Sequence, residues 1–218
     1  MKLLALFGLL AALVPSTLQS LQKTPIDDVW VYPHASDQTD AYLRIWGQDG
    51  KSVAAKGEDT ENLSYSYLRF DVSDLPKDKK LATATLTLTH VAEPTWTTEI
   101  AKTAPIEARA MSGDFDEKSW SYDKLSTIVP NGDPKSIFAS VSAKVPSNSD
   151  KPFTISLDLL SGKGGFSQYL IEALKSGKLL IALTSPLDPQ ASGDRTVYKF
   201  YSKDAEKAYR PVLELKFE

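Results

Sequence analysis

Apolar and polar residues alternate along several short segments of this chain, which is the pattern of β-strands that turn one face toward a core. In residues 67–72 the apolar side chains of Leu68, Phe70 and Val72 alternate with those of Tyr67, Arg69 and Asp71. A turn at Pro76 ends the segment. We therefore expect the apolar set to face the core, and the polar set to form a stiff outer surface.

Similar segments predict strands at residues 29–32, 42–46, 81–91, 105–111, 153–159, 179–184, 197–201 and 212–217. One helix is predicted at residues 166–175, where Tyr169, Leu170 and Leu174 have helical spacing and Gly177 is placed to end it. Many short strands with long connections and a single short helix favour an all-β protein. The prediction is one antiparallel β-sandwich, jelly-roll-like.

The N-terminus has the order of a secretory signal peptide. Lys2 precedes the uncharged residues 3–14, and the small or polar residues Ser16, Thr17 and Ser20 follow. A dozen apolar residues is short of the roughly 20 that span a bilayer as a helix. We therefore expect a signal peptide at 1–20, a domain at 21–218, secretion to the extracellular space or the cell surface, and no membrane span.

Composition narrows the function further. The chain of 218 residues contains no cysteine, so neither disulfides nor thiolate chemistry are available. Its formal net charge is −3 with both signs mixed, which argues against a nucleic-acid partner. We expect a single domain that is a monomer.

Three predicted strands carry aromatic and basic residues on one face. These residues are Tyr42, Arg44 and Trp46, then Tyr67 and Arg69, then Lys199 and Tyr201. If the three strands share one sheet, the rings could stack on sugars while the cations bind hydroxyls or uronate carboxylates. Arg69→Ala should then weaken glycan retention more than it lowers the melting temperature. The alternative is that the rings belong to the core and the cations are ordinary surface charges.

Acidic residues gather in the N-terminal loops, at Asp37, Asp40, Asp49, Glu58, Asp59 and Glu61. They are candidates for a structural calcium, although no EF-hand spacing is present and solvated loop acids are the alternative. No other cofactor is expected.

Catalytic motifs are absent from the sequence. The two histidines, His34 and His90, lie in no zinc motif, and no nucleophile elbow or phosphate loop is present. We therefore expect no enzyme. Carboxylates that meet only in the fold would still allow a hydrolase, and a lyase site of Tyr with His or Arg also stays open.

Several motifs occur in the order found in one family. Residues 67–76 are followed by Ala82, Ala84, Leu86 and Leu88, with residues 28–31 before them. Phe115, Glu117 and Trp120 come next, and residues 200–205 then precede residues 211–213. Over residues 27–217 the chain resembles DNRLRE-type domains, which overlap carbohydrate-binding module family 96.

This resemblance implies a secreted jelly-roll sandwich that binds polysaccharide without cleaving it, with alginate-like uronic polymers among the ligands. Phe115 replaces the family's usual tryptophan, and the loops at 96–105 and 126–151 look longer, so the identity of the ligand does not transfer. Our leading hypothesis is a secreted polysaccharide-binding protein. A structural or adhesion domain is second, and a polysaccharide lyase or hydrolase is third.

Overall fold

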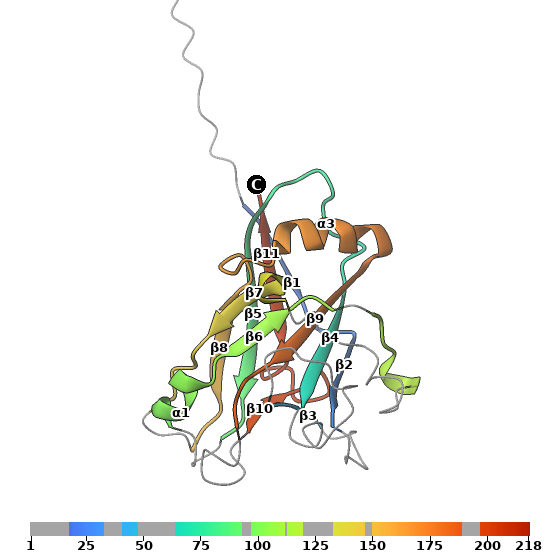
Figure 1. The fold of residues 1–218 in the computed structure, drawn as a ribbon. Coiled ribbons are helices and arrows are strands. Elements are labelled where there is room, and N and C mark those ends of the chain that lie inside the picture. The colour runs from blue at the N-terminus through green and yellow to red at the C-terminus, as the bar shows by residue number, and fades with distance from the viewer. Residues whose placement is uncertain are drawn as a thin grey trace, which may run out of the picture.

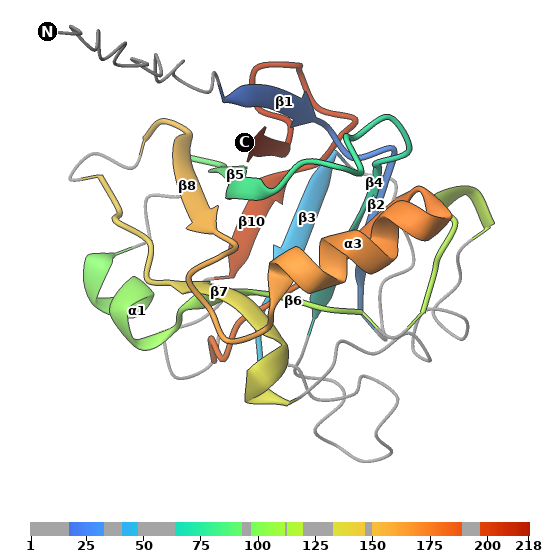
Figure 2. The same ribbon diagram turned by 90° about the horizontal axis from the view of Figure 1, so that it is seen from above.

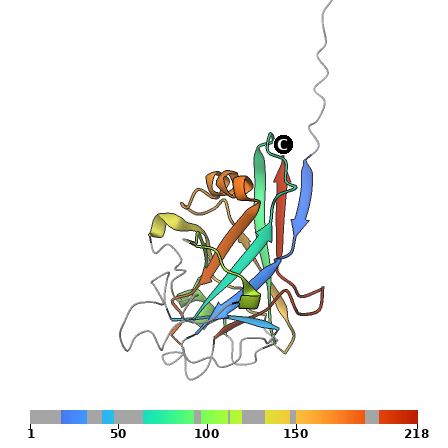
Figure 3. The same ribbon diagram turned by 90° about the vertical axis from the view of Figure 1, so that its right-hand side faces the viewer.

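Two antiparallel sheets make up the computed structural model, which describes residues 18–32, 41–47, 64–92, 97–111, 113–119, 133–146, 150–188 and 197–218. The six-stranded sheet has the order β1-β11-β5-β10-β3, with β8 also pairing with β5. Its strands are β1 (Gln19–Lys23), β3 (Tyr42–Ile45), β5 (Leu81–His90), β8 (Phe153–Asp158), β10 (Tyr198–Tyr201) and β11 (Val212–Phe217). Figure 3 shows β1 beside β11.

The five-stranded sheet has the order β2-β4-β9-β6-β7. Its strands are β2 (Asp27–Val31), β4 (Tyr65–Asp71), β6 (Ile106–Arg109), β7 (Ile137–Val141) and β9 (Lys178–Thr184). All of the pairings in both sheets are antiparallel. The predicted all-β antiparallel sandwich is confirmed.

The main core lies between the two sheets and consists of the apolar residues of the alternating segments. Leu68 and Phe70 of β4 are fully buried there, as are Leu86 and Leu88 of β5. On the other face of β5 the threonines run from exposed at Thr83 to buried at Thr89. Period-two alternation therefore assigned the inner faces of both strands correctly.

A second apolar cluster covers the outer face of the five-stranded sheet. It consists of Val29, Val31, Tyr65, Tyr67, Met111, Phe115 and Ala182. Because Leu68 points into the main core, Tyr67 points outward, but the Phe115 ring lies 6.0 Å from its ring and Tyr67 is fully buried. The outer face of β4 is therefore not an open surface.

The helix predicted at 166–175 is present as α3 (Phe166–Ser176) and ends at Gly177, whose φ of 74° is left-handed. A second helix, α1 (Thr98–Thr103), was not predicted; the Thr97 side chain caps it by accepting from the Ile100 N–H. The two helices lie at opposite ends of the sandwich (Figure 1). Within the described ranges, neither helix has the length and apolar composition to cross a membrane.

Two glycines before α3 offer a test of packing against β7. A Cβ on Gly162 would lie 2.3 Å from the Ile137 carbonyl oxygen, whereas a Cβ on Gly165 would meet nothing within 4 Å. Gly165 has a φ of 63°, which alone costs an L-residue roughly 1 kcal/mol. Gly162→Ala should lower the unfolding free energy by about 1–3 kcal/mol through overpacking. Urea unfolding of both variants tests this: a smaller loss in Gly162→Ala than in Gly165→Ala would contradict it.

Candidate functional site

Strands β3 and β10 pair directly and lie side by side (Figure 2). Their register places Arg44 opposite Lys199 and Tyr42 opposite Tyr201. The alternate residues, Leu43 and Ile45 of β3 and Tyr198 and Phe200 of β10, are buried in the main core. Four of the seven predicted site residues therefore share the outer face of one strand pair, where each is partly exposed.

Aromatic rings line one part of this face. The Tyr42 and Tyr201 rings lie 5.5 Å apart, and Tyr209, which the sequence did not single out, stacks on Tyr201 at 4.7 Å and 21°. Lys199 Nζ lies 4.1 Å from the centre of the Tyr42 ring. We call Tyr42, Arg44, Lys199, Tyr201 and Tyr209 the aromatic–basic face. Burial, together with Tyr42, Tyr209 and Glu206, raises the pKa of Tyr201, so its hydroxyl stays protonated at neutral pH.

Beyond Arg44 lie three more aromatic residues, Trp30, Tyr32 and Trp46, which we call the tryptophan corner. The Trp30 ring stacks on Tyr32 at 6.1 Å, and Tyr32 lies 5.2 Å from Trp46. The Arg44 guanidinium lies 4.5 Å above the Trp30 ring, which links the corner to the aromatic–basic face. Sequence reasoning missed Trp30 and Tyr32 as site residues, although they alternate with Val29 and Val31 in the same way.

Side-chain hydrogen bonds fix β3 against the start of β4 in the other sheet. Ser64 Oγ and Ser66 Oγ both donate to the Arg44 carbonyl, at 3.0 and 2.9 Å. Trp46 and Ser64 form an isolated antiparallel bridge. The Arg44 backbone and Trp46 are therefore held in place from both sheets.

The premise that all three predicted strands share one sheet is wrong. Strand β4 belongs to the five-stranded sheet, whereas β3 and β10 belong to the six-stranded sheet. Tyr67 is fully buried in the second apolar cluster, so its ring has no surface for a ligand in this structure. Alternation gave the side of the strand to which Tyr67 points, but not the segment that covers it.

Arg69 also lies apart from the aromatic–basic face. Its guanidinium pairs with Asp27 on β2, lies 3.2 Å from Asp114 Oδ1 and donates to the Phe115 carbonyl at 2.5 Å. Only 14% of the side chain is exposed. These contacts fasten residues 114–115 over the sheet, which is a structural role.

Three carboxylates from distant parts of the chain meet in one cluster. Oxygens of Asp28, Glu117 and Asp204 lie within 4.8 Å of one another, a spacing that could suit a metal ion. The Lys203 ammonium, however, already lies 3.0 Å from Glu117 and 2.9 Å from Asp204. We therefore interpret this group, the carboxylate–Lys203 cluster, as a network of ion pairs.

Asp28 is the buried member of this cluster. Its carboxylate accepts a hydrogen bond from the Lys203 N–H at 2.7 Å, and the Asp28 N–H donates to Glu117 at 3.1 Å. Burial, with a smaller contribution from the charge of Glu117, raises the pKa of Asp28 to about 7. Burial also raises the pKa of Glu117. No spacing in the sequence predicts this cluster, although each member lies in a segment that carries the family resemblance.

His90 belongs to the core. Its Nε2 accepts from the Lys199 N–H at 3.3 Å, and its Nδ1 therefore donates to the Val91 carbonyl at 2.7 Å. Burial lowers the pKa of His90 to about 4, so the ring is neutral at physiological pH. His90 supports β10 beneath the aromatic–basic face.

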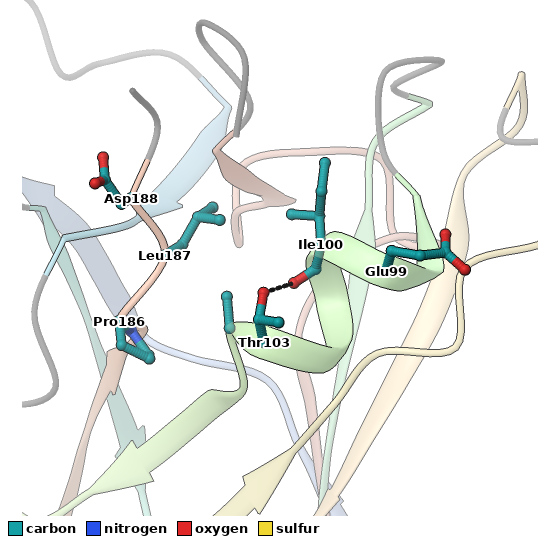
Figure 4. Close-up of a pocket in the computed structure, with 7 residues that line it drawn as sticks. Glu99, Ile100, Thr103, Pro186, Leu187 and Asp188 are labelled. Atoms are coloured by element: carbon teal, nitrogen blue, oxygen red, sulfur yellow. Dashed lines mark hydrogen bonds between the residues drawn. The ribbon is translucent and has the colours of Figure 1, made fainter. Parts of the chain in front are cut away.

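A cavity of about 340 Å³ lies between α1 and residues 186–188 (Figure 4). Ile100, Ala104 and Leu187 give it an apolar lining, and Thr103 uses its hydroxyl to donate to the Ile100 carbonyl. The carboxylates of Glu99 and Asp188 point away from each other (Figure 4). The described residues that line this cavity do not include the facing pair of carboxylates that glycoside hydrolysis uses.

The calcium prediction falls outside the described residues. Its acids are Asp37, Asp40, Asp49, Glu58, Asp59 and Glu61, and His34 also lies outside.

Strand β1 begins at Gln19, two residues before the predicted start of the domain at residue 21.

Comparison with known proteins does not assign a family. No protein-family model matches the chain, and no curated protein matches its sequence.

Proposed function

We propose that this is a secreted protein that binds polysaccharide without cleaving it, and that the aromatic–basic face is the binding surface. The observation that carries the proposal is the β3–β10 register, which sets two basic residues beside two tyrosines whose rings are in contact. Ring faces contact the apolar faces of sugars, and a cation within reach binds carboxylates. The resemblance to carbohydrate-binding DNRLRE-type domains agrees with this use.

The rings and cations of this surface are held in place before any ligand binds. Residues on β-strands have stiff backbones, and the rings of Tyr42, Tyr201 and Tyr209 support one another through ring contacts. A surface ordered in advance loses little conformational entropy on binding. Arg44 and Lys199 favour an acidic, uronate-containing glycan over a neutral one.

A structural or adhesion role is the second candidate. The ring contacts of the aromatic–basic face would serve stability alone in that case, and no glycan would bind. A lyase or hydrolase remains the third candidate, for which none of the sites described above offers a specific observation.

Affinity electrophoresis against acidic and neutral glycans tests the proposal. We expect retention by an acidic glycan such as alginate. Lys199→Met should weaken it by about 10- to 150-fold, because a charge-assisted hydrogen bond contributes roughly 1.5–3 kcal/mol. Tyr201→Ala should weaken retention by both classes of glycan, whereas Tyr201→Phe keeps the ring and should retain most binding.

Lys144→Met is the matched control, since Lys144 is exposed and follows β7 in the other sheet. If no glycan retards the wild-type protein, the proposed function is wrong. If Lys144→Met weakens retention as much as Lys199→Met does, binding is a general charge effect.

A further inference from the structure

We infer that Asp28 is a positioning residue for the aromatic–basic face: it holds the turn after β10, and its protonation favours the buried arrangement of that turn. The link to glycan affinity rests on the proposed function above. The link to the geometry of the tyrosines does not, because it can be measured without any ligand.

The first step of the argument is the attachment of the turn. Residues 202–205 form a tight turn in which Asp204 N–H donates to Ser202 Oγ at 3.2 Å. Ser202 N–H donates to the Ala41 carbonyl at 3.0 Å, which ties the turn to the start of β3. Lys203 N–H donates to Asp28, which ties the turn to β2 in the other sheet. Asp28 therefore fixes where the turn sits relative to both sheets.

The second step connects the turn to the rings. Tyr201 is the last residue of β10, immediately before the turn, and Tyr209 lies in the next turn, at residues 206–209. Tyr209 N–H donates to the Glu206 carbonyl at 2.9 Å, and the Tyr209 ring stacks on Tyr201 at 4.7 Å. A shift of the turn therefore changes how Tyr209 covers Tyr201, and so changes the surface offered to a ligand.

The third step is charge. Asp28 faces Glu117 from the 3₁₀ helix η2 (Glu117–Ser119), and Lys203 and Asp204 from the turn. With Asp28 ionised, three carboxylates share one ammonium, and Asp28 itself is only 4% exposed. A proton on Asp28 weakens the hydrogen bond that its carboxylate accepts from Lys203 N–H, but it removes the larger cost of a buried charge beside Glu117 and Asp204. Protonation therefore favours the buried, compact arrangement on balance.

The window for this effect lies near neutral pH, where burial places the pKa of Asp28. Uronate carboxylates are already ionised throughout that window. His90 titrates near pH 4, below the window. We therefore expect the aromatic–basic face to be better ordered, and glycan affinity higher, on the acidic side of neutral.

NMR of the full folded chain tests the geometric part. We expect the Asp28 side-chain carboxyl signal to titrate near neutral pH, and the ring signals of Tyr201 and Tyr209 to shift with the same midpoint. In Asp28→Asn, which keeps an oxygen to accept from Lys203 N–H, those ring signals should stay constant between about pH 5.5 and about pH 8. Asp116→Asn makes the same charge change at an exposed position and should behave as the wild type.

If Asp28→Asn does not fold, Glu117→Gln serves instead: it removes a neighbouring negative charge and should shift the Asp28 midpoint to lower pH. The inference would be overturned if the Asp28 carboxyl were fully ionised at about pH 5.5. It would also be overturned if the ring signals of Tyr201 and Tyr209 did not change as Asp28 titrates.

Alginate retention at about pH 5.5 and about pH 8 tests the functional part. The wild type should lose about 3- to 10-fold in affinity at the higher pH, and Asp28→Asn should lose none. If alginate binds equally well at both pH values, Asp28 does not regulate the face. Ring signals that follow Asp28 without retention by any glycan would instead support the positioning role and refute the proposed function.

Discussion

Arg109→Ala is expected to lower the free energy of unfolding by about 3–5 kcal/mol, because it leaves a buried carboxylate without its partner. Arg109 is 2% exposed and donates to Glu107 through Nε at 3.1 Å and Nη2 at 2.6 Å. Its Nε also lies 3.3 Å from Thr184 Oγ1 on the neighbouring strand β9. The guanidinium thus joins β6 to β9 in the centre of the five-stranded sheet.

Urea unfolding of two variants separates the pair's net contribution from the cost of breaking it. The double variant Glu107→Gln/Arg109→Met removes both charges at similar volume and should lose much less stability than Arg109→Ala. If the double variant loses as much unfolding free energy as Arg109→Ala, then lost packing rather than the unpaired carboxylate accounts for the loss of stability. A loss below about 1 kcal/mol in Arg109→Ala would contradict the prediction.

Most of the strands that the sequence predicted carry apolar residues that alternate over several positions, whereas β9 is a continuous apolar run. Strand β4, with Leu68 and Phe70 inward, is an example, and the paired faces of β3 and β10 followed from the same period. Alternation is a local property, and each of these strands has enough buried apolar residues for the pattern to be recognised in the sequence.

The elements that were missed lack that signal. Strand β1 is a mostly exposed edge strand with a single large apolar residue, Leu21. Its first two residues, Gln19 and Ser20, also fall within the predicted signal peptide at 1–20. Strand β7 contributes only Phe138 and Ala139 to the core and lies in a polar stretch. Helix α1 spans six residues, which is too short for a helical period to be recognised.

The site was predictable only as far as the alternation within each strand, which is local, whereas the β3–β10 pairing joins distant parts of the chain. Tyr42, Arg44, Lys199 and Tyr201 could be grouped because each strand carries two of them on one face. The covering of Tyr67 by Phe115 and the meeting of Asp28 with Lys203 depend on contacts between segments far apart in the chain. Such contacts leave no periodic trace in one sequence.

Arg69 is where the sequence and the structure lead to opposite experimental expectations. The sequence alone suggests a sugar contact, whereas the structure shows a guanidinium with three partners: Asp27, Asp114 and the Phe115 carbonyl. Loss of the pair with Asp27 accounts for most of the expected cost, because both side chains are largely buried and Asp27 would keep an unpaired charge. Asp114 is 43% exposed, so its pairing contributes little.

Arg69→Ala should therefore lower the unfolding free energy by about 3 kcal/mol and leave glycan retention unchanged at temperatures where the variant is folded. Arg69→Lys keeps the charge but loses the forked guanidinium that reaches Asp27 and Phe115 together. Its unfolding free energy should therefore lie between those of the wild type and Arg69→Ala. Lys199→Met is the opposite control, with weaker retention and little change in stability. Retention that falls in Arg69→Ala at unchanged stability would make Arg69 a ligand contact and would move the binding surface to the five-stranded sheet.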